Sequence, residues 1–277
     1  MAGRIESPSS INTYRQCPRK YYYVYIAKYP TLPSIHLIRG NVAHKALEDF
    51  FDIDDKDLDK IGLNDYHVVL KTRMKRLLKK HWLAGISEFR KLDISNDQHL
   101  FYFRETQEML QRWTALFIRK LGKEIEKHGG LKQAFRQLTP DREFELNSQV
   151  FRVKGYIDCI EKNEGRIRVM DYKTSKSCHM SEGYKLQLAI YSLLYYEQYG
   201  KLPDEVGIYF LRHDEHTMPV DEQLLEFARK EVELIHQKNQ SDDINDYPKK
   251  EGPLCKYSTG QCDFYDLCFN SNNDSQN

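Results

Sequence analysis

Apolar and polar residues alternate along a stretch in the second half of the chain. The pattern predicts two β-strands, roughly 150–161 and 166–174, joined by a tight turn in which Gly165 supplies the left-handed backbone of a hairpin. In the second strand Asp171 and Lys173 follow two apolar residues on one face, because side chains alternate between the two faces of a sheet. A carboxylate and an ammonium thus stand on a side that we expect to face the core.

Charges on a core-facing side are costly unless they bind an ion or pair with each other. Asp158, in the first strand, can lie beside Asp171. Two carboxylates and a lysine at one sheet end suggest a divalent-metal site for phosphoryl transfer. The simpler interpretation is a salt bridge between Asp171 and Lys173, with Asp158 in a turn. For an arbitrary Asp-x-Lys in a strand the salt bridge is the more common outcome, so the surrounding motifs must decide.

Two helical patterns open the chain. Ser9 or Ser10 can cap a short helix that is interrupted at Cys17, since the residue before a proline is pushed out of the helical region. Gly40 is expected to open a second helix, whose apolar stripe has His44 on its edge. A lone histidine at such a position is more often a hydrogen-bonded boundary residue than a metal ligand.

The middle of the chain has long helical patterns. The acidic segment 52–59 reads as a solvated linker, and helices are predicted over 65–83 and 97–128. They indicate a helical insert, about 54–138, packed on the sheet or arching over it. Six of the ten residues in 71–80 are Lys or Arg. A solvated helix face is the slightly favoured interpretation; the alternative is a strip that contacts phosphates along a nucleic-acid strand.

After the hairpin, a helix over 183–199 carries Gln187 and Tyr191 one turn apart on one face. The remaining predicted elements are strands from Arg142, at 205–213 and near Met218, and a helix over 221–237. The pattern as a whole predicts an α/β protein with one domain over 1–269 and a disordered tail, 270–277.

Composition narrows the functional classes. The 277 residues are 40% hydrophobic and 30% charged, with a net charge of +1. Any contact with nucleic acid must therefore come from local patches rather than from the overall charge. The sequence has no apolar run long enough to span a membrane, and its first residues lack the apolar region of a secretory signal. We expect a cytoplasmic protein with reduced cysteines.

Three cysteines, Cys255, Cys262 and Cys268, fall within 14 residues. Closely spaced thiols in a reducing compartment are typical of a metal site, and a zinc ion or a [4Fe–4S] cluster needs a fourth ligand. Cys17 is the candidate. Cys159 is expected to be a buried strand residue that points away from its neighbour Asp158. No histidine lies within the triplet, which favours an all-thiolate site.

Six short motifs occur in the same order as in a known family. They are S-x-I-N-T-Y-R-Q-C-P with Cys17, G-N-V-A-H-K-A-L-E with His44, G-Y-I-D with Asp158, D-Y-K-T-S-K with Asp171 and Lys173, Q-L-A-I-Y with Gln187 and Tyr191, and the cysteine triplet. Together they resemble the RecB-like branch of the PD-(D/E)XK nuclease superfamily. Within it, they are similar to members with an iron–sulfur cluster, such as the AddB nuclease domain and CRISPR-associated RecB-like exonucleases.

The resemblance implies a restriction-endonuclease-like fold, in which helices flank a mixed central sheet and the cluster joins the two ends of the chain. The residues it implies as ligands of Mg²⁺ or Mn²⁺ are His44, Asp158, Asp171 and the backbone carbonyl of Tyr172. Lys173 would orient the attacking water and offset charge in the transition state. Gln187 and Tyr191 would line the site, and Glu145 is a further candidate carboxylate.

The implied activity is a metal-dependent DNA exonuclease that acts on single strands or ends, in repair, recombination or CRISPR-related processing. The sequence has no G-x-x-x-x-G-K-[ST] motif, so any DNA unwinding would come from a helicase partner. The alternative is a non-catalytic DNA-end-binding subunit of a helicase or recombination complex. An iron–sulfur cluster or a zinc ion would join the two ends of its chain.

Overall fold

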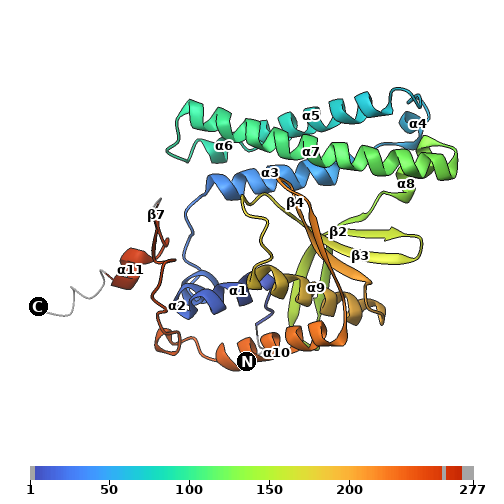
Figure 1. Cartoon of the computed structure of the whole chain (residues 1–277). Helices are drawn as coiled ribbons and strands as arrows, with labels where there is room; N and C mark the ends of the chain where they lie inside the picture. The colour runs from blue at the N-terminus through green and yellow to red at the C-terminus, as the bar shows by residue number, and fades with distance from the viewer. Residues whose placement is uncertain (1–3, 258–259, 270–277) are drawn as a thin grey trace, which may run out of the picture.

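A five-stranded mixed sheet forms the centre of the protein (Figure 1). The computed structural model describes residues 4–257 and 260–269. The strands, in spatial order, are β1 (Asp141–Ser148), β2 (Val153–Asn163), β3 (Arg166–Lys173), β4 (Glu205–Phe210) and β5 (Glu215–Pro219). Only β3 and β4 pair in parallel; the other neighbours are antiparallel. The parallel pair is connected through helix α9 (Glu182–Tyr199), because parallel strands need a crossover. The α/β fold expected from the sequence is confirmed.

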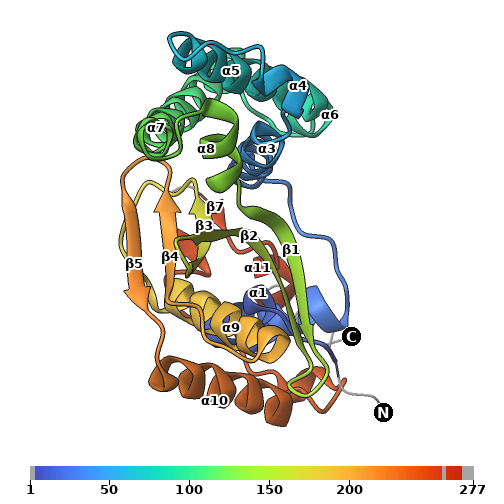
Figure 2. The same ribbon diagram turned by 90° about the vertical axis from the view of Figure 1, so that its right-hand side faces the viewer.

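Helices cover both faces of the sheet (Figure 2). Helix α9 packs on one face, α1 (Pro8–Gln16) and α10 (Glu222–Lys238) pack against α9, and Val169 of β3 belongs to the core on that side. Met170 and Tyr172 belong to the core on the opposite side. The alternation along β3 therefore serves two separate cores, as expected for a sheet buried on both faces.

The opposite face carries a layer of helices drawn at the top of Figure 1. It consists of α3 (Ile35–Phe50), α4 (Asp55–Leu58), α5 (Tyr66–Ala84), α6 (Ile86–Phe89), α7 (Asn96–His128) and α8 (Leu131–Gln137). Ser95 starts α7 with a capping box that includes Gln98, and Gly129 ends it in the left-handed conformation. The boundaries of α7 agree closely with the sequence pattern, because both of its caps are encoded locally.

Three local predictions are wrong. Helix α3 begins at Ile35, so Gly40 lies inside the helix instead of opening it. The cap of α1 is Ser7, whose side chain accepts a hydrogen bond from the Ser10 backbone, rather than Ser9 or Ser10. The acidic segment 52–59 is more than a solvated linker: it contains α4, and its two apolar residues are buried against the helical layer.

The two ends of the chain lie close together. Cys17 ends α1, and the short helix α2 (Pro18–Tyr21) and a π-helical turn (Tyr22–Ile26) follow it. The C-terminal part contains a 3-10 turn (Ile244–Asp246), the hairpin β6 (Lys256–Tyr257) and β7 (Gly260–Gln261), and helix α11 (Tyr265–Phe269). Tyr23 packs its ring on Phe264. The predicted tail, 270–277, lies outside the described residues.

Candidate metal and catalytic site

The C-terminal end of β3 meets α3 and β2. His44 of α3 lies with Nδ1 3.2 Å from Oδ1 of Asp158 and with Nε2 3.0 Å from the carbonyl oxygen of Tyr172. Oδ2 of Asp158 accepts a hydrogen bond of 2.7 Å from the Tyr172 backbone N–H. The Tyr172 carbonyl accepts from Nε2, and Nδ1 forms an ion pair with Asp158 when the imidazole is protonated. Burial lowers the pKa of His44, but the hydrogen bond and charge of Asp158 outweigh burial and raise it to about 9.

Asp171 is buried behind this group. Its Oδ2 lies 2.5 Å from Nζ of Lys173, and its Oδ1 accepts a hydrogen bond of 2.9 Å from the amide of Gln187 on α9. The same amide donates to the hydroxyl of Tyr191 at 2.8 Å. Burial raises the pKa of Asp171 to about 6, against the opposing charge of Lys173. The salt bridge between Asp171 and Lys173 that the sequence suggested is therefore present. Asp158 lies in the same site, so the salt bridge does not exclude a metal site.

Close packing between α9 and β2 holds Tyr191 in this position. A Cβ atom on Gly155 would lie 2.9 Å from the Tyr191 ring, a separation that side chains do not tolerate. Glycine in the G-Y-I-D motif thus lets the helix approach the strand that carries Asp158.

Glu143 joins the site, although no sequence motif points to it. Ligand atoms of His44, Glu143 and Asp158 all lie within 4.8 Å of one another. The strand register explains this, because Arg142 pairs with Cys159 and Phe144 with Ile157, which places Glu143 opposite Asp158.

The backbone at Glu143 is unusual, with a φ of 47°. Strand alternation reverses at this point: Cys159 belongs to the core under the helical layer, whereas Ile157, two residues earlier, belongs to the core under α9. Regular alternation would put both on one face. Glu145, the carboxylate proposed from the sequence, is instead exposed and lies opposite Tyr156. The positive φ at Glu143 breaks the strand alternation, so the alternating sequence pattern does not predict which carboxylate faces the site.

The donor set fits a hard divalent cation. Carboxylates, a backbone carbonyl and one imidazole suit Mg²⁺ or Mn²⁺. Burial raises the pKa of Glu143, and the negative charges of Asp158 and Glu48 raise it further. Crowded carboxylates of this kind gain most from a nearby cation. His44 would have to lose its proton to bind one, because imidazole ligates in the neutral form.

Two arginines fix the backbone directly after Lys173. Nη1 of Arg39 lies 2.6 Å from a carboxylate oxygen of Glu105 on α7, and Arg212 contacts the same carboxylate at 2.7 Å through two nitrogens. Both guanidinium groups also donate to the carbonyl of Thr174, at 3.2 and 3.3 Å. These residues belong to none of the sequence motifs, and they connect the helical layer to the end of β3.

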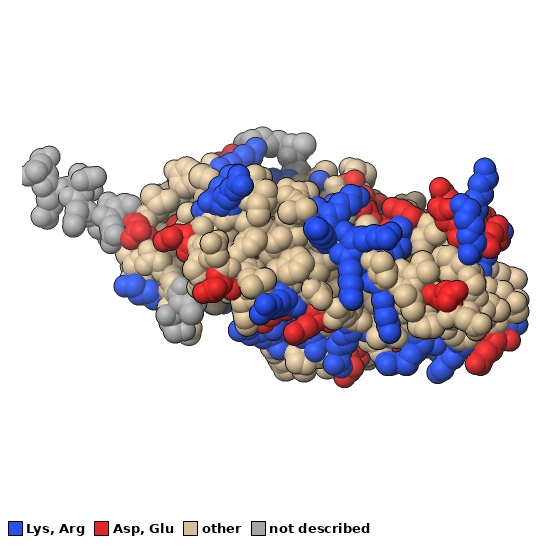
Figure 3. Space-filling model, turned by 90° about the horizontal axis from the view of Figure 1, so that it is seen from above, with Lys and Arg blue, Asp and Glu red and all other residues tan. Residues whose placement is uncertain are grey.

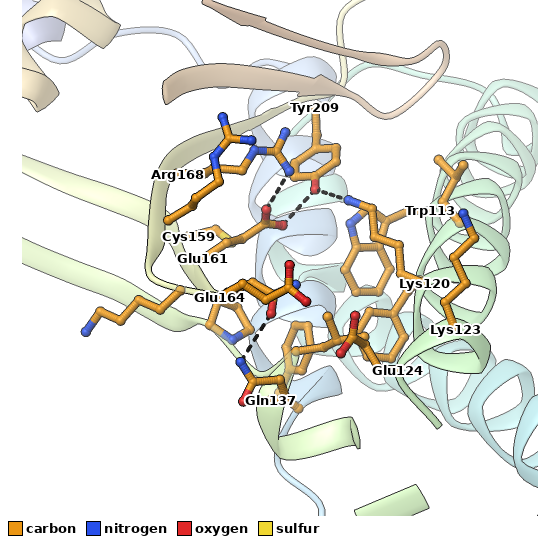
Figure 4. A pocket seen from close by; sticks show the side chains of 18 of the residues that line it. Trp113, Lys120, Lys123, Glu124, Gln137, Cys159, Glu161, Glu164, Arg168 and Tyr209 are labelled. Atoms are coloured by element: carbon orange, nitrogen blue, oxygen red, sulfur yellow. Dashed lines mark hydrogen bonds and ion pairs between the residues drawn. The ribbon is translucent and has the colours of Figure 1, made fainter. Parts of the chain in front are cut away.

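A second hollow lies behind the site, between α7 and the start of β3 (Figure 4). Its wall is formed by the Tyr172 ring, which stacks on Tyr209. The Tyr209 hydroxyl donates to Glu161 at 2.7 Å and accepts from Lys120 at 2.9 Å. Arg168 pairs with Glu161 at 2.8 Å. Tyr172 thus turns its backbone toward the carboxylates and its ring toward a separate ion network that braces the sheet.

Four thiols line one hollow of about 400 Å³ between the two ends of the chain. They are Cys17, Cys255, Cys262 and Cys268. Burial raises the pKa of Cys268, and the lysines Lys20, Lys249 and Lys250 line the same hollow. Four thiols with cations around them fit an anionic thiolate–metal centre. Cys159 is buried in β2, as expected.

The chain belongs to the PD-(D/E)XK nuclease superfamily, whose sequence model matches residues 6–269. A curated relative is the CRISPR-associated exonuclease Cas4 of Francisella tularensis subsp. novicida, 24% identical over 139 residues. The match spans 50% of this chain and 65% of that protein, just under two thirds of its length.

A solved structure of a candidate exonuclease from Eubacterium rectale has a similar fold. The TM-score is 0.51 at 12% sequence identity, and the match covers 92% of this chain and 86% of that one. At this identity the likeness concerns the fold alone. Among the described residues, no helix is long and apolar enough to cross a membrane.

Proposed function

We propose that this chain is a Mg²⁺- or Mn²⁺-dependent deoxyribonuclease that works as an exonuclease on single-stranded DNA or DNA ends. The observation that carries the proposal is the convergence of His44, Asp158 and Asp171 with Lys173 at one end of the sheet. Membership of a nuclease superfamily supports the reaction class.

Each side chain has a proposed role. The ligands of the cation would be His44, Asp158, Asp171 and the Tyr172 carbonyl, with Glu143 as an additional carboxylate. When bound, the cation would act as a Lewis acid toward the phosphate and lower the pKa of a water molecule. Lys173, held by Asp171, would orient that water and stabilise negative charge that develops on the phosphate. Gln187 would hold Asp171 in place, and Tyr191 would in turn hold Gln187.

The cysteines would carry a [4Fe–4S] cluster, with zinc as the alternative. Four thiols are a donor set that suits either centre. A brown protein after anaerobic purification would support iron–sulfur, and a colourless one zinc.

The cellular setting is proposed from the same resemblance. The Cas4 relative supports a role in CRISPR-related processing, with repair and recombination as the other settings. A helicase or recombination partner would supply unwinding. A reducing compartment such as the cytoplasm would keep the thiols available.

Cleavage of end-labelled single-stranded DNA in Mg²⁺ or Mn²⁺ tests the activity. We expect Asp171→Asn and Lys173→Ala to lower the rate by about 100-fold or more, a typical cost of removing one transition-state contact. Lys162→Ala is the matched control, because Lys162 pairs with Asp141 at the other end of the hairpin. If wild type and both site variants bind DNA but none cleaves it under any metal, the chain is the non-catalytic end-binding subunit instead.

A further inference from the structure

Helix α5 concentrates the positive charge of the protein. Its 19 residues include six Lys and Arg and no Asp or Glu. The other 258 residues therefore carry a net charge of −5, because the whole chain has +1. A single helix that opposes the charge of the rest of the molecule is a local electrostatic site.

Three lysines of α5 form a stripe, defined here as Lys71, Lys75 and Lys79. They follow one another at every fourth position, so they lie on one helix face, and all three are exposed. Across the described residues none of them has an ion-pair or hydrogen-bond partner. By contrast, Lys80 pairs with Asp49, and Arg73 donates to backbone carbonyls after α3.

The stripe destabilises the helix that carries it. Like charges four residues apart on a helix repel each other. Exposed apolar residues flank the stripe: Val68 is 55% exposed and Leu83 56%. The three lysines repel one another, and no acidic side chain among the described residues pairs with them. An anionic partner that covers this face would remove the repulsion.

Helix α5 lies on the far side of α3 from the sheet that carries the carboxylates. In Figure 1, α5 is the outermost helix, and α3, which carries His44, lies beneath it. Figure 3 shows Lys and Arg gathered over this outer surface. The stripe therefore does not contact the reacting phosphate.

We propose that the stripe binds the sugar–phosphate backbone of the nucleic acid that flanks the reacting end. The three lysines follow one another at about 6 Å along the helix, about 12 Å in all, so each can contact a different phosphate of one strand. This inference rests on the proposed nuclease function and extends it. The flanking segment is held on the outer helix while its end enters the site, so long substrates bind more tightly than short ones.

The test compares long and short DNA. The triple variant Lys71→Gln, Lys75→Gln, Lys79→Gln is made in an Asp171→Asn background, so that binding is measured without cleavage. The control variant is Lys201→Gln, Lys230→Gln, Lys238→Gln. These three lysines are exposed and lie in or next to α9 and α10, on the other side of the sheet. Gln and Lys have similar helix propensity, so both variants should fold, and circular dichroism checks this.

Affinity is measured across a salt series with single strands of about 60 and about 8 nucleotides. The short strand is no longer than the segment that one binding groove typically holds. For the long strand we expect the slope of log K against log salt to become shallower by about 2, since each lost phosphate contact removes about 0.7. The short strand and the control variant should show no change. Replacing the three lysines with arginine should restore long-strand binding.

Unchanged long-strand binding in the glutamine variant would overturn the inference. In that case, loss of binding to polyglutamate in the same variant would assign the stripe to an acidic protein. Cleavage of the short strand by the wild-type chain tests the proposed function separately. A chain that cleaves but shows no stripe effect refutes only the inference, and one that binds through the stripe but never cleaves refutes only the proposed function.

Discussion

At the scale of single residues, the site depends on which carboxylate faces His44. Glu143 and Glu145 lie two positions apart in β1, and regular alternation would give them equivalent places. The left-handed φ at Glu143 and the reversal of alternation beside Asp158 separate them. One of the two joins the metal-ligand group, and the other faces solvent.

This difference gives a matched pair of variants. We expect Glu143→Gln to weaken Mn²⁺ binding by about tenfold or more, on the scale seen when groups that support a metal site are removed. Glu145→Gln should bind Mn²⁺ like the wild type. Titration calorimetry with Mn²⁺ measures both. Equal affinities for the two variants would remove Glu143 from the ligand set.

At the scale of elements, the end of β3 is held by α3 and α7 together. Arg39 and Arg212 share the Glu105 carboxylate and the Thr174 carbonyl. Burial raises the pKa of Glu105, but its hydrogen bond with Arg212 and the charges of both arginines outweigh burial and lower it. The pair of arginines thus makes the helical layer part of the support for Lys173.

Glu105→Gln tests this coupling. Removing the carboxylate leaves two facing arginines without their anion, which we expect to lower the free energy of unfolding by about 3 kcal/mol at neutral pH. Because the folded pKa is lowered, the carboxylate stabilises the fold above its ordinary pKa of about 4.3, and the stabilisation is lost as the pH falls.

The difference between wild type and Glu105→Gln should therefore shrink in acid. Denaturant unfolding at several pH values measures it. Glu108→Gln is the control, because Glu108 lies one turn further along α7 and is exposed. A difference between wild type and Glu105→Gln that stays constant down to pH values below the ordinary pKa of glutamate would contradict the assignment.

At the scale of the whole molecule, the cysteine site joins the ends of the chain. A link from Cys17 to Cys255 closes a loop of 238 residues. Closing so long a loop would stabilise the fold by up to about 5 kcal/mol through the entropy of the unfolded chain. The distant ends would then depend on the bound metal centre for their packing.

Cys17→Ala should lose metal content and solubility together. Cys178→Ala is the control, since Cys178 is partly buried beside α9 and outside the hollow. Metal analysis and thermal melting after anaerobic purification measure the two effects. A Cys17→Ala protein with full metal content and the melting temperature of the wild type would show that Cys17 is not a ligand.

The sequence by itself determined the long elements and several residues of the candidate site. Helix α7 follows from its caps and periodicity, and the two faces of β3 follow from strict alternation. The order of the motifs was enough to select His44, Asp158 and Asp171. These signals are local or linear, so they survive without coordinates.

Only the tertiary structure decided which groups meet. Glu143 was missed because its backbone departs from the strand pattern, and Glu105 because no local signal links α7 to Thr174. The same holds for Lys71, whose basic segment is evident in the sequence but whose outward direction depends on α3 and α7 packing on the other side of α5. Periodicity fixes the face of an element, whereas long-range packing fixes what that face meets.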